Sequence, residues 1–372
     1  MKFKIPGKLM LAGEWAALEQ RPSLVLAINR FVEVEILEAS CFTINTPYLD
    51  EVEFVYEKDK LRFRKVLTGE LKNKLSFAKK TIKIFLKFME ENANPITPFK
   101  LTTKSHDTII KIDDKEVKVG FGSSAAVCVG IGTAIMKFYD YDINDKKIKD
   151  IIFKLSCIAH FSAQDFNGSC YDVAASVYGG VLYYKTFNSF WLKNEIQTGK
   201  TLLEILEGDW PGLVIKEIKI PENIKILCCY TGKEANSREL IKKMDTFKDK
   251  KYDDYIKIID EIEVDVDSIL DAFESGNERE IKMMLHKNQS DFVELDGLSK
   301  IGLLTPELRK IVEIANDNDC VGKISGAGGG DCAVAFCFND ENCDKLIKSW
   351  EKEGLYPINV EISLDGVREA NS

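Results

Sequence analysis

The sequence predicts a two-domain protein of mixed helix and sheet, of the α+β or the α/β class. Stretches typical of strands and of helices alternate in both halves of the chain. With 372 residues, the chain is longer than one hydrophobic core usually supports. An irregular stretch over 185–222, which contains Trp, Pro and Gly residues, separates the two halves. We therefore expect an N-terminal domain over 1–200 and a C-terminal domain over 201–372.

The elements of the N-terminal half follow from their apolar patterns. An apolar strand follows the Pro6-Gly7 turn, and β-branched residues with partial alternation predict a strand over 24–36. The segment 51–66 is typical of a hairpin. Apolar residues recur at helical spacing over 75–92 and predict an amphipathic helix. Two more helices are expected over 124–139 and 146–163, and 172–184 is expected to change from a helical turn to a strand at Gly179-Gly180.

The C-terminal half shows a similar alternation. A strand is expected in the sequence IKILCCYTG, another in DCAVAFCF and a last one in YPINVEIS. Helices are expected over 236–246, 252–275, 278–292, 306–316 and 341–353.

Composition excludes several classes of protein. The formal net charge of −9 argues against a general nucleic-acid binder, which would need a basic face. The N-terminus has no apolar run like that of a signal peptide, and the longest apolar run, around 127–136, is too short to span a bilayer. We therefore expect a cytoplasmic protein without a membrane partner. Its ten irregularly spaced cysteines are then expected to be reduced and mostly buried, and a zinc site is not expected.

The first of three glycine-bearing motifs is the sequence GFGSSA. Gly120 and Gly122 allow close approach of the backbone to a ligand, and Ser123, Ser124 and Ala125 open an apolar helix. The first amides of a helix have no partners within it, and its N-terminus carries partial positive charge. The motif therefore suggests a phosphate site, although a tight turn with a serine cap remains open.

The second motif is the sequence SGAGGGD near the C-terminus, which leads into a strand. Its backbone amides could line a ligand pocket. So many glycines raise the conformational entropy that is lost on folding, which favours a functional reason for their presence. The order of elements disfavours a dinucleotide oxidoreductase, because the dinucleotide fingerprint follows a strand and opens a helix. The third motif is PGKLMLAGE, where Lys8 taken alone could be a solvated lysine.

Together the three motifs resemble those of the GHMP kinase superfamily, in the same order. The sequence AHFSAQDFNGSCYDVAASVYGG resembles the phosphomevalonate kinase branch, as do LLEILEGDWPGL, CYTGKEANSREL, LDGLS and SGAGGGDC. The resemblance extends from residue 5 to about 338. It implies an α+β fold with an N-terminal domain like domain 2 of ribosomal protein S5 and a ferredoxin-like C-terminal domain.

The resemblance also implies an activity and its ligands. The γ-phosphoryl group of ATP would be transferred, with Mg²⁺, to the 5-phosphate of mevalonate 5-phosphate in the mevalonate pathway. The protein would be a monomer or a homodimer. A phosphate monoester has a second pKa near 6, so its attacking oxygen is largely ionised at neutral pH. A general base is therefore needed less than for an alcohol.

The resemblance assigns roles to individual residues. Lys8, Lys118 and Asp172 would be catalytic, with Asp172 orienting Lys8 or the ligands at least as much as it takes a proton. ATP would bind at Gly120, Gly122, Ser123, Ser124 and Ala125, with Ser124 near the magnesium ion. The acceptor would bind at Lys8, Ser169, Ser237, Ser325, Gly326, Ala327 and Gly328.

Two departures and three alternatives accompany this resemblance. Many relatives have Gly where Asp165 and Cys170 stand, and the glutamate that mevalonate kinase uses on magnesium aligns near His160. Another GHMP kinase, above all mevalonate kinase, is the first alternative. A catalytically silent ligand sensor is the second, although Lys8, Ser124 and Asp172 are all present. A dinucleotide oxidoreductase is the third.

Overall fold

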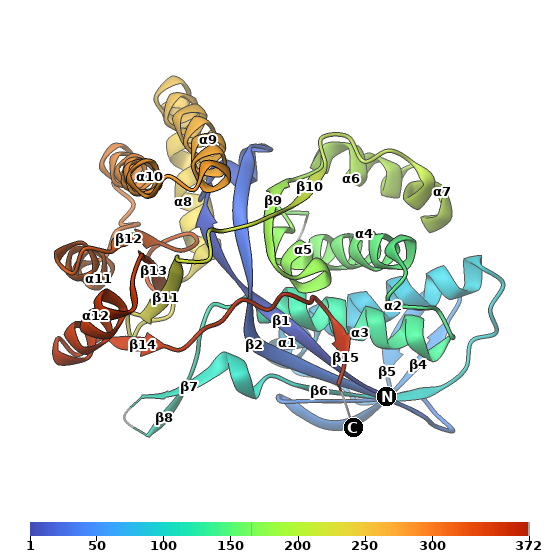
Figure 1. The fold of residues 1–372 in the computed structure, drawn as a ribbon. Coiled ribbons are helices and arrows are strands. Elements are labelled where there is room, and N and C mark those ends of the chain that lie inside the picture. Colours follow the sequence, from blue (N-terminus) through green and yellow to red (C-terminus); the bar gives the residue numbers. More distant parts are fainter. Residues whose placement is uncertain (113, 165, 371–372) are drawn as a thin grey trace.

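A large sheet formed mainly by the N-terminal half organises the first part of the fold (Figure 1). The computed structural model describes residues 1–112, 114–164 and 166–370. The strands of this sheet run in the order β10-β9-β2-β6-β3-β4-β5, and β1 joins β2 to β15. Their bounds are β1 (Lys2–Ala12), β2 (Pro22–Glu38), β3 (Thr43–Thr46), β4 (Leu49–Glu57), β5 (Lys60–Phe63), β6 (Phe99–Lys104), β9 (Val181–Lys185), β10 (Val214–Ile218) and β15 (Arg368–Glu369).

Helices cover one face of this sheet. A hydrophobic core joins that face to the apolar sides of α2, α3, α4 and α5. The helical elements of this half are η1 (Ala16–Glu19), α1 (Gly69–Lys74), α2 (Ser76–Glu91), η2 (His106–Thr108), α3 (Ser123–Phe138), α4 (Lys146–Ala163), α5 (Tyr171–Tyr178), α6 (Ser189–Gln197) and α7 (Leu202–Glu207). A separate hairpin of β7 (Ile109–Ile112) and β8 (Lys115–Lys118) leads into the start of α3.

Helix α3 packs closely against its neighbours because two of its residues have no side chain. A Cβ atom at Gly130 would lie 2.6 Å from Ile5 Cδ1, and one at Gly132 would lie 2.3 Å from the Cζ atom of buried Phe85. The position of α3, and thus of the loop that precedes it, therefore depends on these glycines.

Replacement of Gly132 by Ala is expected to lower the unfolding free energy by about 1–3 kcal/mol, because the added methyl group overpacks a rigid aromatic contact. Gly297→Ala is the matched control. Gly297 lies in a helix with nothing within 4 Å of its would-be Cβ, so the control should gain up to about 1 kcal/mol from helix propensity. Urea denaturation of both variants measures the difference, and equal stabilities would contradict this account of α3 packing.

The C-terminal half forms a four-stranded antiparallel sheet in the order β12-β13-β11-β14. Its chain order of strand, helices, two strands, helix and strand, combined with this spatial order, is the ferredoxin-like arrangement. Its elements are β11 (Lys225–Tyr230), α8 (Ser237–Lys250), α9 (Tyr252–Ser275), α10 (Glu278–Ser299), α11 (Pro306–Asp317), β12 (Val321–Ile324), β13 (Cys332–Cys337), α12 (Asp340–Lys352) and β14 (Tyr356–Ile358).

The long strands β1 and β2 connect the two halves (Figure 1). Apolar residues such as Leu9, Leu26 and Ile28 share one buried core with β11, β13 and the helices α9 and α10. The chain then returns from β14 to place β15 beside β1, the first strand of the chain. Because one core joins both halves, Lys8 on β1 has a defined position relative to the glycine loop between β12 and β13.

Most of the expected elements are confirmed. The hairpin over 51–66 turns at Lys58 and Asp59, both with positive φ, and the helices expected from 75 to 163 form within one residue of their expected bounds. The ten cysteines are all free and nine are buried, as predicted. No helix in the described ranges is long and apolar enough to cross a membrane.

Other expectations about local structure were wrong. The stretch 185–222 is not irregular, since it forms α6, α7 and β10. Helix α10 continues to Ser299, and β14 is shorter than the strand expected in YPINVEIS. The domain boundary at residue 200 stays a prediction, although β10 and β15, from beyond it, belong to the first sheet. Asp165 lies outside the described residues.

Candidate active site

A cavity of about 260 Å³, here called the first cavity, lies where the three glycine-bearing motifs meet. Strand β1 contributes Lys8 to its wall, the start of α5 contributes Asp172, and the loop between β12 and β13 contributes Asp331. Of the predicted site residues, the first cavity brings together Lys8, Gly120, Gly122, Ser169, Asp172, Ser237, Ser325, Gly326, Ala327 and Gly328. The structure thus assembles residues that are up to 320 positions apart in the sequence.

Lys8 points from β1 toward the loop that opens α3. Its Nζ donates to the carbonyl oxygen of Gly120 over 3.1 Å and lies 5.6 Å from the centre of the Tyr171 ring. Burial by itself lowers the pKa of the Lys8 ammonium, but the acidic groups of Tyr171, Asp172 and Asp331 outweigh it and raise that pKa above its ordinary value. Lys8 is therefore a cation at neutral pH, placed beside a cavity.

The start of α3 has the form of an anion site. Gly122 precedes the helix with φ 76°, and a Cβ atom there would lie 3.0 Å from Lys8 Cγ, so both the backbone conformation and the packing favour glycine. No side chain among the described residues caps this helix. The amides of Ser123, Ser124 and Ala125 therefore have no side-chain acceptor, which suits them to bind phosphate oxygens.

His160 links the start of α3 to the start of α5. Its Nε2 lies 3.2 Å from Ser124 Oγ and 3.8 Å from Asp172 Oδ2, and its buried ring stacks on Phe77. Burial lowers the pKa of His160, whereas the charge of Asp172 and a hydrogen bond with Cys170 raise it, and the net shift is upward. A carboxylate, an imidazole and a hydroxyl thus form one polar chain between the two helix starts.

Cys170 occupies a position where the backbone favours glycine. Its φ of 59° is left-handed, a conformation that glycine adopts with less strain than other residues, and it precedes α5 directly. Hydrogen bonds with Cys157 and His160 lower the pKa of the buried Cys170 thiol against the effect of burial. Cys170 therefore adopts, directly before α5 and two residues before Asp172, the left-handed conformation that glycine favours.

The glycine loop between β12 and β13 forms the opposite wall of the first cavity. Ser325 is held by β1, since its hydroxyl accepts from the Met10 amide over 3.1 Å and donates to the Met10 carbonyl over 3.0 Å. Gly328 has φ 77°, and a Cβ atom there would lie 2.5 Å from the Leu303 carbonyl oxygen. The predicted role of Ser325 in acceptor binding stays a prediction, because its hydroxyl already has two backbone partners.

Asp331 is a residue of the site that the sequence reasoning missed. Its carboxylate lies against the backbone of Gly120, where a Cβ atom would lie only 2.6 Å from Asp331 Oδ2, and the backbone amides of Gly120 and Ala235 act to lower its pKa. Burial raises the pKa of Asp331 to about 6, against the charge of Lys8. Its Oδ1 is buried and has no partner among the described groups. The signal in the sequence was an acidic residue directly after the glycines. In the structure this residue has a positive φ of 53°.

Ser169 and Ser237 lie on the wall of the first cavity, on different elements. Ser169 is buried, and its carbonyl oxygen accepts from the Tyr184 hydroxyl. Ser237 is exposed and is the first residue of α8, whose cap is the side chain of Asn236. The start of α8 is therefore a second helix N-terminus at the first cavity.

A second cavity of about 200 Å³ lies beside the start of α3. Ser123 and Ser124 line it together with Lys118, Lys104 and a partly apolar wall, which includes Pro47, Tyr48, Leu75, Phe77 and Val127. Lys118 is exposed at the end of β8 and lines this cavity, not the first one. The structure thus places Lys118 on a different cavity from Lys8 and Asp172. The sequence did not reveal the second cavity, because four separated segments build it.

A buried ion pair joins β12 to the loop after β1. Lys323 Nζ lies 2.7 Å from Glu14 Oε1 and donates to the Ile324 carbonyl over 3.0 Å, and both charged side chains are almost completely buried. Glu14 lines the first cavity. The pair was not expected, since its members are 309 positions apart in the chain.

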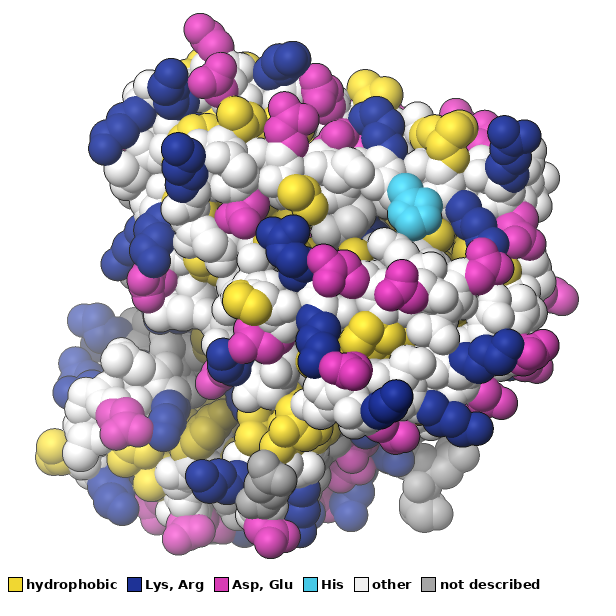
Figure 2. Space-filling model, turned by 90° about the vertical axis from the view of Figure 1, so that its left-hand side faces the viewer, with side chains coloured by type: hydrophobic (Ala, Val, Ile, Leu, Met, Phe, Trp, Pro, Cys, Tyr) yellow, Lys and Arg dark blue, Asp and Glu magenta, His cyan; other side chains and the backbone are white. Residues whose placement is uncertain are grey.

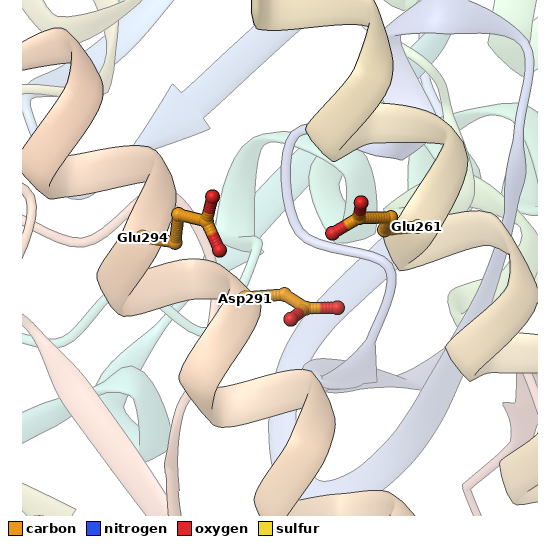
Figure 3. A group of neighbouring side chains, drawn as sticks. All are labelled: Glu261, Asp291 and Glu294. Carbon is orange, nitrogen blue, oxygen red and sulfur yellow. The ribbon is translucent and has the colours of Figure 1, made fainter.

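Three carboxylates on α9 and α10 form a separate acidic group (Figure 3). Glu261 faces Asp291 and Glu294, with ligand atoms within 4.8 Å of one another. The ammonium of Lys287 already bonds Asp291 and buried Asp265, at 2.9 and 2.6 Å. Asp291 therefore takes part in an ion-pair network between the two helices.

The chain matches two family models in the regions that build the site. Residues 76–180 match the model of the GHMP kinase N-terminal domain, and residues 269–355 match that of the GHMP kinase C-terminal domain. The two matches together cover just over half of the chain. The chain therefore belongs to the GHMP kinases, and its two-domain fold is the fold of that family.

Similar proteins include kinases with different acceptors. The chain is 23% identical to a phosphomevalonate kinase of a Streptomyces species, over 97% of each chain. It is 26% identical to a mevalonate kinase of Methanocaldococcus jannaschii, over 95% of this chain and 97% of the other. Its fold is similar to that of Streptococcus pneumoniae phosphomevalonate kinase in complex with phosphomevalonate and AMPPNP, with a TM-score of 0.82, 23% identity and coverage of 97% and 99%.

The residues present fit an ATP–magnesium complex. An uncapped helix start suits phosphate, and the partly apolar wall of the second cavity suits a nucleobase. Mg²⁺ prefers oxygen ligands and is usually held by few protein groups together with substrate phosphates. The Ser124 hydroxyl offers one such oxygen, and no group of three candidate ligands lies at this point among the described residues.

Proposed function

We propose that this chain is a phosphomevalonate kinase. It would transfer the γ-phosphoryl group of ATP to the phosphate of mevalonate 5-phosphate, giving mevalonate 5-diphosphate and ADP. Family membership supports a kinase, and both phosphomevalonate and mevalonate kinases are among its relatives. The choice between the two acceptors therefore depends on the residues of the site. The observation that carries it is the start of α8 at Ser237, which lies on the same cavity as Lys8 and Asp172.

The nucleotide is assigned to the second cavity and the start of α3. The base and ribose would lie against the wall that contains Tyr48 and Leu75, with the phosphates at Gly120, Gly122, Ser123, Ser124 and Ala125. Lys118, at the mouth of this cavity, would neutralise phosphate oxygens. When bound, Mg²⁺ would neutralise charge on the phosphates, and Ser124 would supply its protein ligand.

Lys8 and Asp172 are assigned to the transfer itself. Phosphoryl transfer needs positioning and charge neutralisation more than proton removal when the attacking oxygen is already ionised. Lys8 stays protonated and would hold the transferring oxygens. Asp172 would orient Lys8 and the ligands, since it raises the pKa of that ammonium and lies beside His160.

The acceptor is assigned to the remainder of the first cavity. Ser169, Ser237 and the loop of Ser325, Gly326, Ala327 and Gly328 would surround it. The start of α8 offers free amides and partial positive charge to a second anionic group of the acceptor. His160 presents an imidazole, not a further carboxylate, to this cavity beside Asp172, which would limit the negative charge that an anionic acceptor meets.

A coupled assay of ADP release tests this function. The protein is supplied with ATP and Mg²⁺ and with either mevalonate 5-phosphate or mevalonate. We expect turnover with the phosphorylated acceptor alone. Turnover with mevalonate alone would make the chain a mevalonate kinase and restore Asp172 as a base. Silence with both acceptors despite ATP binding would favour a ligand sensor.

A charge reversal tests the position of the acceptor. Ser237→Asp should raise the KM for the phosphorylated acceptor about tenfold or more, because it sets a negative charge at the start of α8. The KM for ATP should change little. Ser290→Asp, on α10, is the matched control. An unchanged acceptor KM in Ser237→Asp would remove α8 from the acceptor site.

A further inference from the structure

A basic groove of about 800 Å³ lies outside both cavities, between β5, α1 and α2. Eight of its fourteen lining residues are Lys or Arg, and one is acidic. The formal net charge of the whole chain is −9, so this concentration of positive charge opposes the overall balance. On the face formed by the C-terminal helices, by contrast, basic and acidic side chains are interspersed (Figure 2).

Most of these cations have no ionic partner among the described residues. Arg64 pairs with Glu53 and Lys83 pairs with Asp59, each at 3.3 Å. The other six have no carboxylate within 4.0 Å in the part of the chain that the structure describes: Lys60, Arg62, Lys65, Lys72, Lys79 and Lys80. Lys79 and Lys83 also lie one turn apart on α2, and like charges at this spacing destabilise a helix. An anion bound in the groove would relieve this repulsion.

We propose that the basic groove binds a small molecule with several phosphoryl groups. Lysine and arginine side chains that converge on a hollow form charge-assisted hydrogen bonds to phosphate oxygens. A single-stranded nucleic acid is less suited, because it would need a basic track that continues beyond the groove and aromatic side chains for stacking. Phe63, the aromatic residue of the groove, is half-buried.

The groove shares a wall with the second cavity. In the segment from α1 to α2, Lys72, Ser76, Lys79 and Lys80 line the groove, whereas 73–75, Phe77 and Ala78 line the second cavity. A ligand in the groove would therefore contact the same segment that forms one wall of the second cavity, where the nucleotide is proposed to bind. This consequence rests on the proposed function: occupancy of the groove should change the apparent affinity for ATP, and ATP should change binding in the groove by the same factor.

Isothermal titration calorimetry with inorganic triphosphate tests the proposal. The second cavity is first saturated with AMPPNP, a non-hydrolysable ATP analogue, so that the probe cannot bind there. Wild type should still bind one equivalent of triphosphate, more weakly as salt increases. The affinity of the groove variant Lys79→Glu/Lys80→Glu for triphosphate should be lower by about tenfold or more. Lys348→Glu/Lys352→Glu, which makes the same charge change on α12, should keep it.

Each other outcome overturns the proposal. No triphosphate binding to AMPPNP-saturated wild type, or equal binding to wild type and the groove variant, would remove the site. If a single-stranded oligonucleotide binds more tightly than triphosphate, and the groove variant loses this binding, the ligand of the groove is a nucleic acid and not a small molecule. These titrations need no turnover. A failure of the kinase assay therefore stays separate from a failure of the groove.

Discussion

The substitution Glu14→Gln is expected to lower the free energy of unfolding by about 3–5 kcal/mol, because it leaves the ammonium of Lys323 buried without a counter-charge. Lys323 has no exposed surface, and its distance to Glu14 Oε1 is 2.7 Å. The carbonyl of Ile324 is its one other partner in the described structure. Urea denaturation followed by circular dichroism measures the loss.

Two controls test whether the loss of stability comes from the burial of this ion pair. Glu274→Gln removes one member of the exposed pair between Lys216 and Glu274 and should change stability by less than about 1 kcal/mol. The double variant Glu14→Leu/Lys323→Met removes both charges and should be more stable than Glu14→Gln. A Glu14→Gln protein as stable as wild type would mean that water or another group reaches Lys323.

The Lys8→Met protein is expected to lose about 10²–10³-fold in kcat, the range seen when one preorganised charge or donor is removed from a transition state. Lys8 is the cation on the first cavity that stays protonated beside Asp172 and Asp331. The KM for ATP should change much less, since Lys8 does not line the second cavity. Steady-state kinetics with the preferred acceptor measures both constants.

Lys4→Met is the matched control on the same strand. Lys4 lies near the ring of Phe31, away from both cavities, so its loss should leave kcat within about twofold. Lys8→Arg should restore little activity, because a planar guanidinium does not replace an ammonium held against the Gly120 carbonyl. Wild-type turnover by Lys8→Met would refute the assignment of Lys8 to the transfer.

Local features of the site could be predicted from the sequence. Gly122 and Gly328 mark places where φ is positive, and the apolar run after Ser123 begins a helix, as the pattern indicates. These features depend on residues that are neighbours in the chain, so turn chemistry and helical periodicity suffice to place them. The resemblance to GHMP kinases rested on the same short motifs.

Other local predictions failed where packing decided the outcome. The segment 185–222 has Gly and Pro at positions that suggest a linker, yet it forms α6, α7 and β10. Strand β10 pairs with β9, and Trp210 packs its ring against Phe187 in the core. Partners outside a segment can impose regular structure that its own composition does not suggest.

By itself, the sequence determined the family, the three glycine-bearing motifs and most of the helices, because each is encoded in residues close together in the chain. Only the tertiary structure decided which of the distant residues meet. It placed Lys118 on a different cavity from Lys8, paired Glu14 with Lys323, and set Asp331 against Gly120. The physical reason is the core shared by β1, β2 and the C-terminal sheet, which orients the two halves through apolar contacts that carry no motif.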